Sequence, residues 1–220
     1  MTEITVYVEG GGNTAGQKAE LRQGFDALFV NEKSKAREKR GSLRFVCCGG
    51  RQQAYDAFIN ALNVNQGGIN ALLVDSETAV PPVPADEVKD AVIRVAHLQA
   101  KGGTEGRGQG DGWGFAGVVS NRIHLMVQCM EAWIVADPDA LQEFYHQDFK
   151  RDALPKQPNL ENASKKDIYE RLRHATENTQ KGEYGKIKHA SKLLVLISPD
   201  RVSLRCPRFR IFRDWLSGSI

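Results

Sequence analysis

Residues 69–77 read Ile-Asn-Ala-Leu-Leu-Val-Asp-Ser-Glu, a run of apolar residues that ends in two acids. An apolar run without polar alternation is typical of a strand buried on both faces, as in a parallel sheet. Apolar, β-branched patterns predict three further strands, at 4–8, 43–48 and 123–127. Helical spacing of apolar residues separates them, at 14–40, 51–62 and 86–99. This alternation predicts an α/β fold with an open, mostly parallel sheet flanked by helices.

The chain changes character after residue 137. A helix is expected at 129–136, directly after the fourth strand, and short helices joined by polar loops follow at 138–145, 164–174, 188–197 and 207–216. Pro199 and Pro207 stand at plausible first helical positions. We therefore expect an α/β domain over 1–137 and a basic helical C-terminal extension over 138–220, packed on it. Seven of the thirteen residues 102–114 are glycine, which predicts a mobile surface loop.

The charge of the chain is unevenly distributed. Residues 1–149 carry 14 basic and 19 acidic side chains, whereas residues 150–220 carry 16 basic and 8 acidic ones. A basic tail favours a polyanionic partner such as nucleic acid. The chain has no apolar run of the roughly 20 residues that a membrane span needs, and no signal peptide is visible. The spacing of its four cysteines matches neither a disulfide framework nor a zinc site, so we expect reduced thiols in a cytoplasmic protein.

Acidic residues stand at the ends of three predicted strands. Glu9 closes the first, Asp75 and Glu77 close the third, and Glu131 follows the fourth by a few residues. Ligands of open parallel sheets bind beyond the carboxyl ends of the strands. If the third strand stays extended to residue 77, alternation puts Asp75 and Glu77 on one face. Converging carboxylates suit Mg²⁺ or Mn²⁺, although acids at strand ends also serve as helix caps or solvated loop residues.

The glycines after the first strand do not form a nucleotide-binding loop. Gln17 stands where the phosphate-loop pattern needs lysine, and Ala15 stands where the dinucleotide pattern needs its third glycine. These departures argue against ATP binding by this chain. The glycines more plausibly let the backbone approach a metal or a scissile phosphate.

The tail holds a second group of candidate residues. Lys186, Lys188 and Lys192 cluster in the segment EYGKIKHASK, and they are candidates for contact with a nucleic-acid backbone. Further on, arginines interleave with Phe209, Phe212 and Trp215, whose helical spacing predicts a core-facing stripe. The alternative for the basic residues is a solubilising surface.

Three short motifs together resemble the Toprim-like superfamily of nucleases and topoisomerase/primase domains. Val8-Glu9-Gly10 matches its glutamate before a glycine, and Asp75-Ser76-Glu77 matches its Asp-x-Asp with Glu in place of the second Asp. Glu131-Ala132-Trp133 resembles a motif of uncharacterised bacterial proteins akin to RloB-type defence proteins. The resemblance implies a Toprim-like sheet, Mg²⁺-dependent phosphodiester chemistry and, frequently, a separate ATPase partner.

The sequence therefore favours a metal-dependent endonuclease of bacterial anti-phage defence that acts on nucleic acid, with DNA the favoured substrate. Asp75, Glu77 and Glu131 would hold Mg²⁺ or Mn²⁺, and Glu9 would bind the metal or act as general base. The main alternative is a non-catalytic Toprim-like adaptor that binds an ATPase or nucleic acid. A primase-like transferase is weaker, because no segment resembles a dedicated nucleotide pocket.

Overall fold

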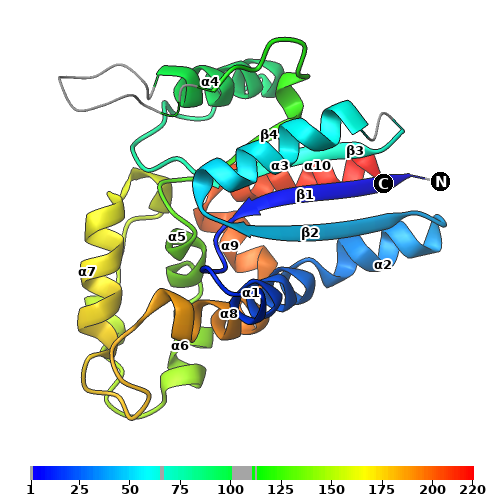
Figure 1. Ribbon diagram of the computed structural model, residues 1–220. Helices are drawn as coiled ribbons and strands as arrows, with labels where there is room; N and C mark the ends of the chain where they lie inside the picture. Colours follow the sequence, from blue (N-terminus) through cyan, green and yellow to red (C-terminus); the bar gives the residue numbers. More distant parts are fainter. Residues whose placement is uncertain (1, 65–66, 101–110, 112) are drawn as a thin grey trace.

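The computed structural model describes residues 2–64, 67–100, 111 and 113–220 (Figure 1). Its sheet has four strands, β1 (Glu3–Glu9), β2 (Ser42–Gly49), β3 (Ile69–Asp75) and β4 (Ile123–Met126). Their order is β2-β1-β3-β4, and every neighbouring pair is parallel. The predicted open parallel α/β sheet is confirmed, with each strand within two residues of its predicted ends.

Helices cover both faces of the sheet. One face packs under α3 (Arg51–Val64) and α4 (Glu87–Ala100), and its core includes Leu72, Val74 and Leu125. The other face packs against α1 (Ala15–Leu28), α2 (Val30–Glu38) and α10 (Pro207–Ser219), seen behind and below the strands in Figure 1. Because successive residues of a strand face opposite sides, β3 is apolar on both, as its sequence predicted.

The prediction of a single helix over 14–40 is wrong. The chain forms two helices, α1 and α2, that meet at Phe29, whose backbone leaves helical geometry (φ −109°, ψ 31°). The Phe29 ring lies 5.2 Å from that of Phe45 and 5.5 Å from that of Phe209. Periodicity along one segment could not reveal this break, because the contacts around it come from the sheet and the C-terminal helix.

The remaining helices lie beyond β4. They are α5 (Glu131–Val135), α6 (Pro138–Tyr145), α7 (Lys165–Thr176), α8 (Lys186–Leu196), α9 (Pro199–Arg205) and α10. Short 3-10 turns at Arg151–Ala153 and Leu160–Asn162 lie among them, and another at Ser120–Arg122 directly precedes β4. Pro199 and Pro207 begin α9 and α10, as predicted. The helix expected at 129–136 begins at Glu131 and is only five residues long.

The C-terminal helices and the sheet share one hydrophobic core. Trp133, Phe209 and Phe212 are fully buried in it, beside sheet residues such as Val6 and Phe45. The interpretation of the tail aromatics as a core-facing stripe is confirmed for Phe209 and Phe212, while Trp215 is partly buried.

Three further expectations concern the surface and the thiols. Residues 102–110 and 112 of the predicted glycine-rich loop lie outside the described residues. The four cysteines are free and buried. Among the described helices, none combines the length and the apolar character that a membrane crossing requires.

Candidate metal centre

Three acidic side chains meet at the carboxyl ends of the two central strands. Glu9 is the last residue of β1 and Asp75 the last of β3, and these strands are neighbours. Glu9 Oε2 accepts a hydrogen bond from the Asp75 backbone N–H at 3.1 Å, which ties the two strand ends together. With Glu77, each residue offers one oxygen, and the three oxygens lie within 4.8 Å of one another. The structure thus brings together the three acids that strand ends predicted.

Glu77 reaches this group by a route that differs from the predicted one. The strand ends at Asp75, and Glu77 has a positive φ of 66°, so extended alternation does not continue to residue 77. The Glu77 backbone N–H donates to the carbonyl of Gln128 at 2.9 Å, in the segment after β4. The convergence of Asp75 and Glu77 therefore depends on a turn held by the neighbouring segment.

Glu131 lies beside this group, outside the set of three. It is fully buried as the first residue of α5, and its Oε1 accepts a hydrogen bond from the Tyr184 hydroxyl at 3.0 Å. The preceding Met130 N–H donates to Asp75 Oδ1 at 2.9 Å, so the start of α5 holds the Asp75 carboxylate. Lys186 Nζ lies 3.6 Å from Asp75 Oδ2 and 3.7 Å from Glu131 Oε1, and so links Glu131 to the centre.

Cationic side chains surround the acids. Arg51 Nη1 donates to Glu9 Oε2 at 3.0 Å and also to the Asp75 carbonyl. Lys165 Nζ lies 2.7 Å from Glu77 Oε1 and 3.4 Å from Asp75 Oδ2. Arg51, Lys165 and Lys186 are the first residues of α3, α7 and α8, so the N-terminal ends of three helices meet at this site. Because helix N-termini carry partial positive charge, this arrangement favours anions.

Burial and charge set the protonation of the centre. Burial raises the pKa of Asp75 to about 6; the nearby charge of Lys186 opposes this shift, and that of Glu9 adds to it. Burial alone would lower the pKa of Lys186, but Asp75 and Glu131 raise it above its ordinary value. Lys165 is likewise kept protonated by Asp75 and Glu77 in spite of its burial. Both lysines are therefore ammonium groups at neutral pH.

The donor set fits a hard divalent cation. Opposite oxygens around Mg²⁺ are about 4.2 Å apart, since each bond is about 2.1 Å long. The Glu9, Asp75 and Glu77 oxygens lie within 4.8 Å of one another, and the Glu77 side chain is 30% exposed, so small side-chain rotations would suffice for the three to reach one ion. Including Glu131 and Asp111, the described part of the chain places five carboxylates against three cationic side chains here, an excess of two negative charges among these residues.

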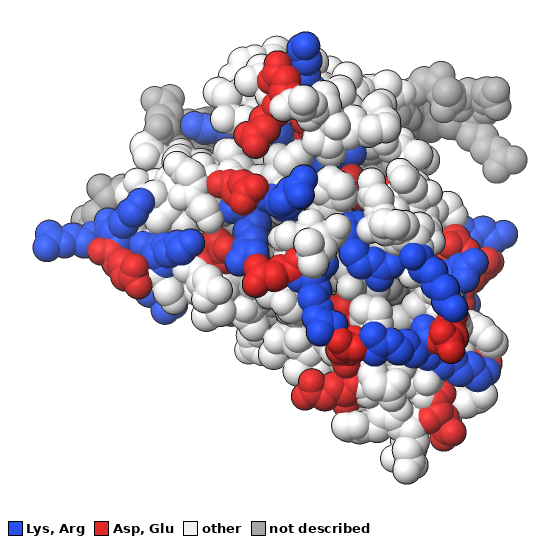
Figure 2. All heavy atoms as spheres, turned by 180° about the vertical axis from the view of Figure 1, so that it is seen from behind, with Lys and Arg blue, Asp and Glu red and all other residues white. Residues whose placement is uncertain are grey.

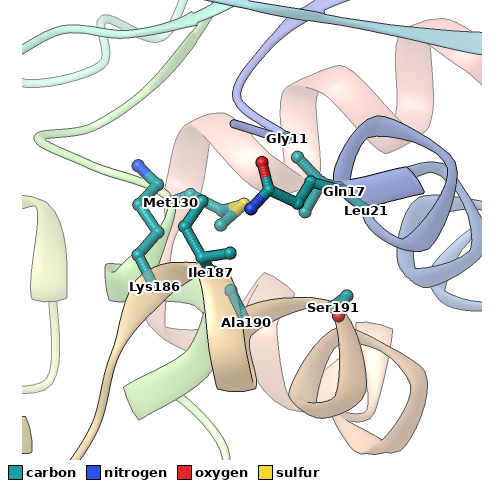
Figure 3. A pocket seen from close by; sticks show the side chains of 8 residues that line it. All are labelled: Gly11, Gln17, Leu21, Met130, Lys186, Ile187, Ala190 and Ser191. Carbon is teal, nitrogen blue, oxygen red and sulfur yellow. The ribbon is translucent and has the colours of Figure 1, made fainter. Parts of the chain in front are cut away.

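The glycine loop and α8 form the wall beside the centre. Gly10 pairs with Gly49 at the end of the sheet, and both have positive φ. Figure 3 shows Gln17, Met130 and Ile187 around a cavity of about 20 Å³, past which the Lys186 side chain extends. A cavity of this size holds about one water molecule. The glycine loop therefore packs closely against α8 beside the acidic centre.

The predicted nucleic-acid residues are separated by the structure. Lys186 belongs to the acidic centre, whereas Lys188 and Lys192 lie on the exposed side of α8, with Lys188 Nζ donating to the Lys181 carbonyl at 2.8 Å. Several tail arginines are used internally: Arg208 is buried against Asp90 and Glu161. Figure 2 shows acidic side chains interleaved with the basic ones over one face of the molecule. The excess charge of the tail therefore does not translate into a uniformly basic surface on this face.

Sequence reasoning missed Arg51, Lys165 and Asp111. Arg51 follows Gly49-Gly50 at the end of β2, so the rule that selected the acids at strand ends applied to it as well. Lys165 follows Ser164, whose hydroxyl accepts the Asp167 N–H at 3.0 Å and caps α7. No local pattern placed the start of α7 next to β3, because that contact joins residues ninety positions apart.

Comparison with known proteins identifies a family without a known activity. Residues 8–217 match the model of a domain of unknown function, DUF4276. No curated protein and no solved structure matches the chain.

Proposed function

Because the chain belongs to the DUF4276 family, whose function is unknown, we propose its function from its own site: metal-dependent hydrolysis of phosphodiester bonds in nucleic acid. The observation that carries the proposal is the meeting of Glu9, Asp75 and Glu77 within 4.8 Å at the carboxyl ends of adjacent parallel strands. The sequence likeness of the three acidic motifs to Toprim-like nucleases supports the same chemistry.

Glu9, Asp75 and Glu77 would hold Mg²⁺ or Mn²⁺, with Glu131 as a further acidic group behind them. A bound divalent cation would polarise the scissile phosphate and lower the pKa of the attacking water. Glu9 is held by Arg51 and by the Asp75 N–H, which orients its carboxylate to bind the metal or to accept a proton from water.

The cations of the site suit an anionic substrate. The Lys165 and Lys186 side chains are about a third exposed and end beside the acids, where an anionic substrate could meet them. Positive groups beside a divalent cation stabilise the charge that develops on a phosphate during hydrolysis. Lys188 and Lys192 on α8 extend the positive charge away from the centre, along a path that a nucleic-acid backbone could follow.

The biological setting that we propose is bacterial anti-phage defence in the cytoplasm, with a separate ATPase as partner. This part of the proposal rests on the sequence resemblance to RloB-type proteins. The poor fit of the glycine loop to nucleotide-binding patterns supports a division of labour in which the partner, and not this chain, uses ATP.

The test is cleavage of supercoiled plasmid and of single-stranded DNA with Mg²⁺ or Mn²⁺. Asp75→Asn keeps the shape of the side chain and an oxygen that can accept from Met130, and Glu77→Gln changes a part-exposed position. We expect each to slow cleavage about a hundredfold or more, as the loss of a charge-stabilising group does in other active sites. Asp152→Asn, at a fully exposed acid, is the matched control and should cleave at the wild-type rate.

Melting temperatures of the variants separate loss of chemistry from loss of fold. Wild-type cleavage by a folded Asp75→Asn variant would place the chemistry elsewhere. If the wild type neither cleaves nor binds Mn²⁺, the acids form a structural ion-pair network with Arg51, Lys165 and Lys186, and the adaptor function becomes the better explanation.

A further inference from the structure

Lys165 occupies the space between two of the proposed metal ligands. Its Nζ lies 2.7 Å from Glu77 Oε1 and 3.4 Å from Asp75 Oδ2. Asp75 is almost fully buried, and two carboxylates this close repel each other unless a positive charge lies between them. The ammonium group therefore supplies the positive charge that a divalent cation would otherwise supply to the same two oxygens.

The backbone of Lys165 is held in place, while its long side chain is held only at its ammonium end. The Lys165 N–H donates to Gln128 Oε1 at 3.2 Å, and Ser164 caps the helix that begins there. The side chain is 28% exposed and has four rotatable carbon–carbon bonds, so the ammonium group can leave towards solvent without disturbing α7. Asp75, by contrast, is fixed by the Met130 N–H.

We propose that Lys165 is a built-in counter-ion, which holds Asp75 and Glu77 together in the metal-free protein and is displaced when a divalent cation binds. This inference rests on the proposed function, because the incoming ion is the proposed metal. On displacement, the ammonium group lies at the mouth of the centre, where it can contact an anionic substrate.

The inference predicts opposite effects of one substitution on metal binding and on cleavage. In Lys165→Gln the ammonium group shared by Asp75 and Glu77 is removed while Lys186 stays beside Asp75, so Mn²⁺ should bind about tenfold more tightly than to the wild type. Cleavage at saturating Mn²⁺ should nevertheless be slower, because the cation that meets the substrate is lost. A residue that merely supports the fold would weaken both.

Titration calorimetry with Mn²⁺ on the full chain tests this, with Lys166→Gln as the matched control. Lys166 is the next residue of α7, is 82% exposed and pairs with Glu170. We expect Lys166→Gln to bind Mn²⁺ as the wild type does. Mn²⁺ affinity of Lys165→Gln equal to, or weaker than, that of the wild type would overturn the inference.

Melting in EDTA provides a readout that needs no metal. Lys165→Gln should melt at a lower temperature than Lys166→Gln, because Asp75 and Glu77 lose their shared counter-ion; equal melting temperatures would also overturn the inference. If neither the wild type nor Lys165→Gln binds Mn²⁺ but the difference in EDTA is present, Lys165 is a counter-ion and the proposed metal chemistry is what fails.

Discussion

His124 is buried on the edge strand β4, next to a charged side chain. Its Nδ1 lies 2.8 Å from Nη1 of Arg94, and its ring packs against those of Phe212 and Trp215. Burial, with the nearby Arg94 charge, holds the pKa of His124 well below its ordinary value. The folded protein therefore keeps this imidazole neutral at a pH where the unfolded chain takes up a proton.

This difference makes stability depend on pH in a defined direction. Below the unfolded-state pKa of about 6.5, His124 takes up a proton in the unfolded chain but not in the folded one, and this favours unfolding. The contribution of neutral His124 to the free energy of unfolding is therefore complete above pH 6.5 and is lost as the pH falls. The free energy of unfolding should therefore fall between pH 7 and pH 5. His124→Gln should flatten the pH dependence of the free energy of unfolding in this range, as measured by urea denaturation.

The exposed His174 provides the control for this titration. His174→Gln, at an imidazole that is 59% exposed, should keep a steeper pH dependence of the free energy of unfolding than His124→Gln. If both variants keep the full slope, other groups carry the pH dependence and His124 titrates normally in the folded protein.

At the scale of elements, the start of α3 joins the acidic centre to Asp111 and to the segment 113–115. Arg51 binds Asp111 through two hydrogen bonds of 2.9 Å while its Nη1 holds Glu9. The Trp113 ring lies over the guanidinium at 4.9 Å and stacks on Tyr55 at 4.5 Å. Arg51 is thus fixed by one segment and orients the carboxylate of another, which makes it a positioning residue for Glu9.

Removal of the Asp111 charge should weaken metal binding. In Asp111→Asn the guanidinium loses its charged partner, so its charge acts more strongly on Glu9 and competes with a divalent cation. We expect Mn²⁺ to bind about tenfold more weakly by calorimetry, at the lower end of the effects that residues behind the ligands have in metal sites.

Tyr55→Phe is the control that separates the loss of the Asp111 charge from a weaker attachment of the segment 113–115 to α3. The Tyr55 hydroxyl bonds the backbone of Gly114 but does not contact the Arg51–Asp111 pair. The variant should bind Mn²⁺ like the wild type. An equal loss of Mn²⁺ affinity in Asp111→Asn and Tyr55→Phe would show that metal binding depends on how the segment 113–115 is anchored, and not on the charge of Asp111.

At the scale of the whole molecule, one core joins the sheet to the C-terminal helices. Phe209 of α10 contacts Phe29 and Trp133, at ring distances of 5.5 Å and 4.7 Å. Arg208 beside it pairs with Asp90 of α4, across the molecule. Residues 138–220 therefore contribute to the packing of the sheet itself, and the two parts of the chain depend on each other for burial.

We therefore expect a single cooperative unfolding transition. Tryptophan fluorescence and far-ultraviolet circular dichroism should give coincident urea curves. Phe209→Ala should lower the free energy of unfolding by about 3–5 kcal/mol in both signals, whereas Leu204→Ala, at a position 82% exposed, should change it by less than about 0.5 kcal/mol. Two separate transitions would contradict this expectation and indicate independent parts.

Local patterns were sufficient for the strands and for the acids at their ends. The apolar run at 69–74 predicted a buried parallel strand, and Glu9 and Asp75 followed from the rule that ligands meet beyond strand ends. Such inferences succeed because the tendency to form a strand depends on the apolar pattern of a few consecutive residues. Whether these acids are catalytic, and whether Lys188 and Lys192 bind nucleic acid, stay predictions.

The partners of the charges depended on the tertiary structure. Glu77 joined Asp75 through a turn held by Gln128, and Lys165 reached the same site from a helix far along the chain. Arg208, which by composition belonged to a basic tail, is buried in ion pairs with Asp90 and Glu161. Sequence determined which segments form strands and which residue types end them, because those preferences are local. The pairing of charges was decided by folding alone, because electrostatic contacts depend on distance in space and not on separation along the chain.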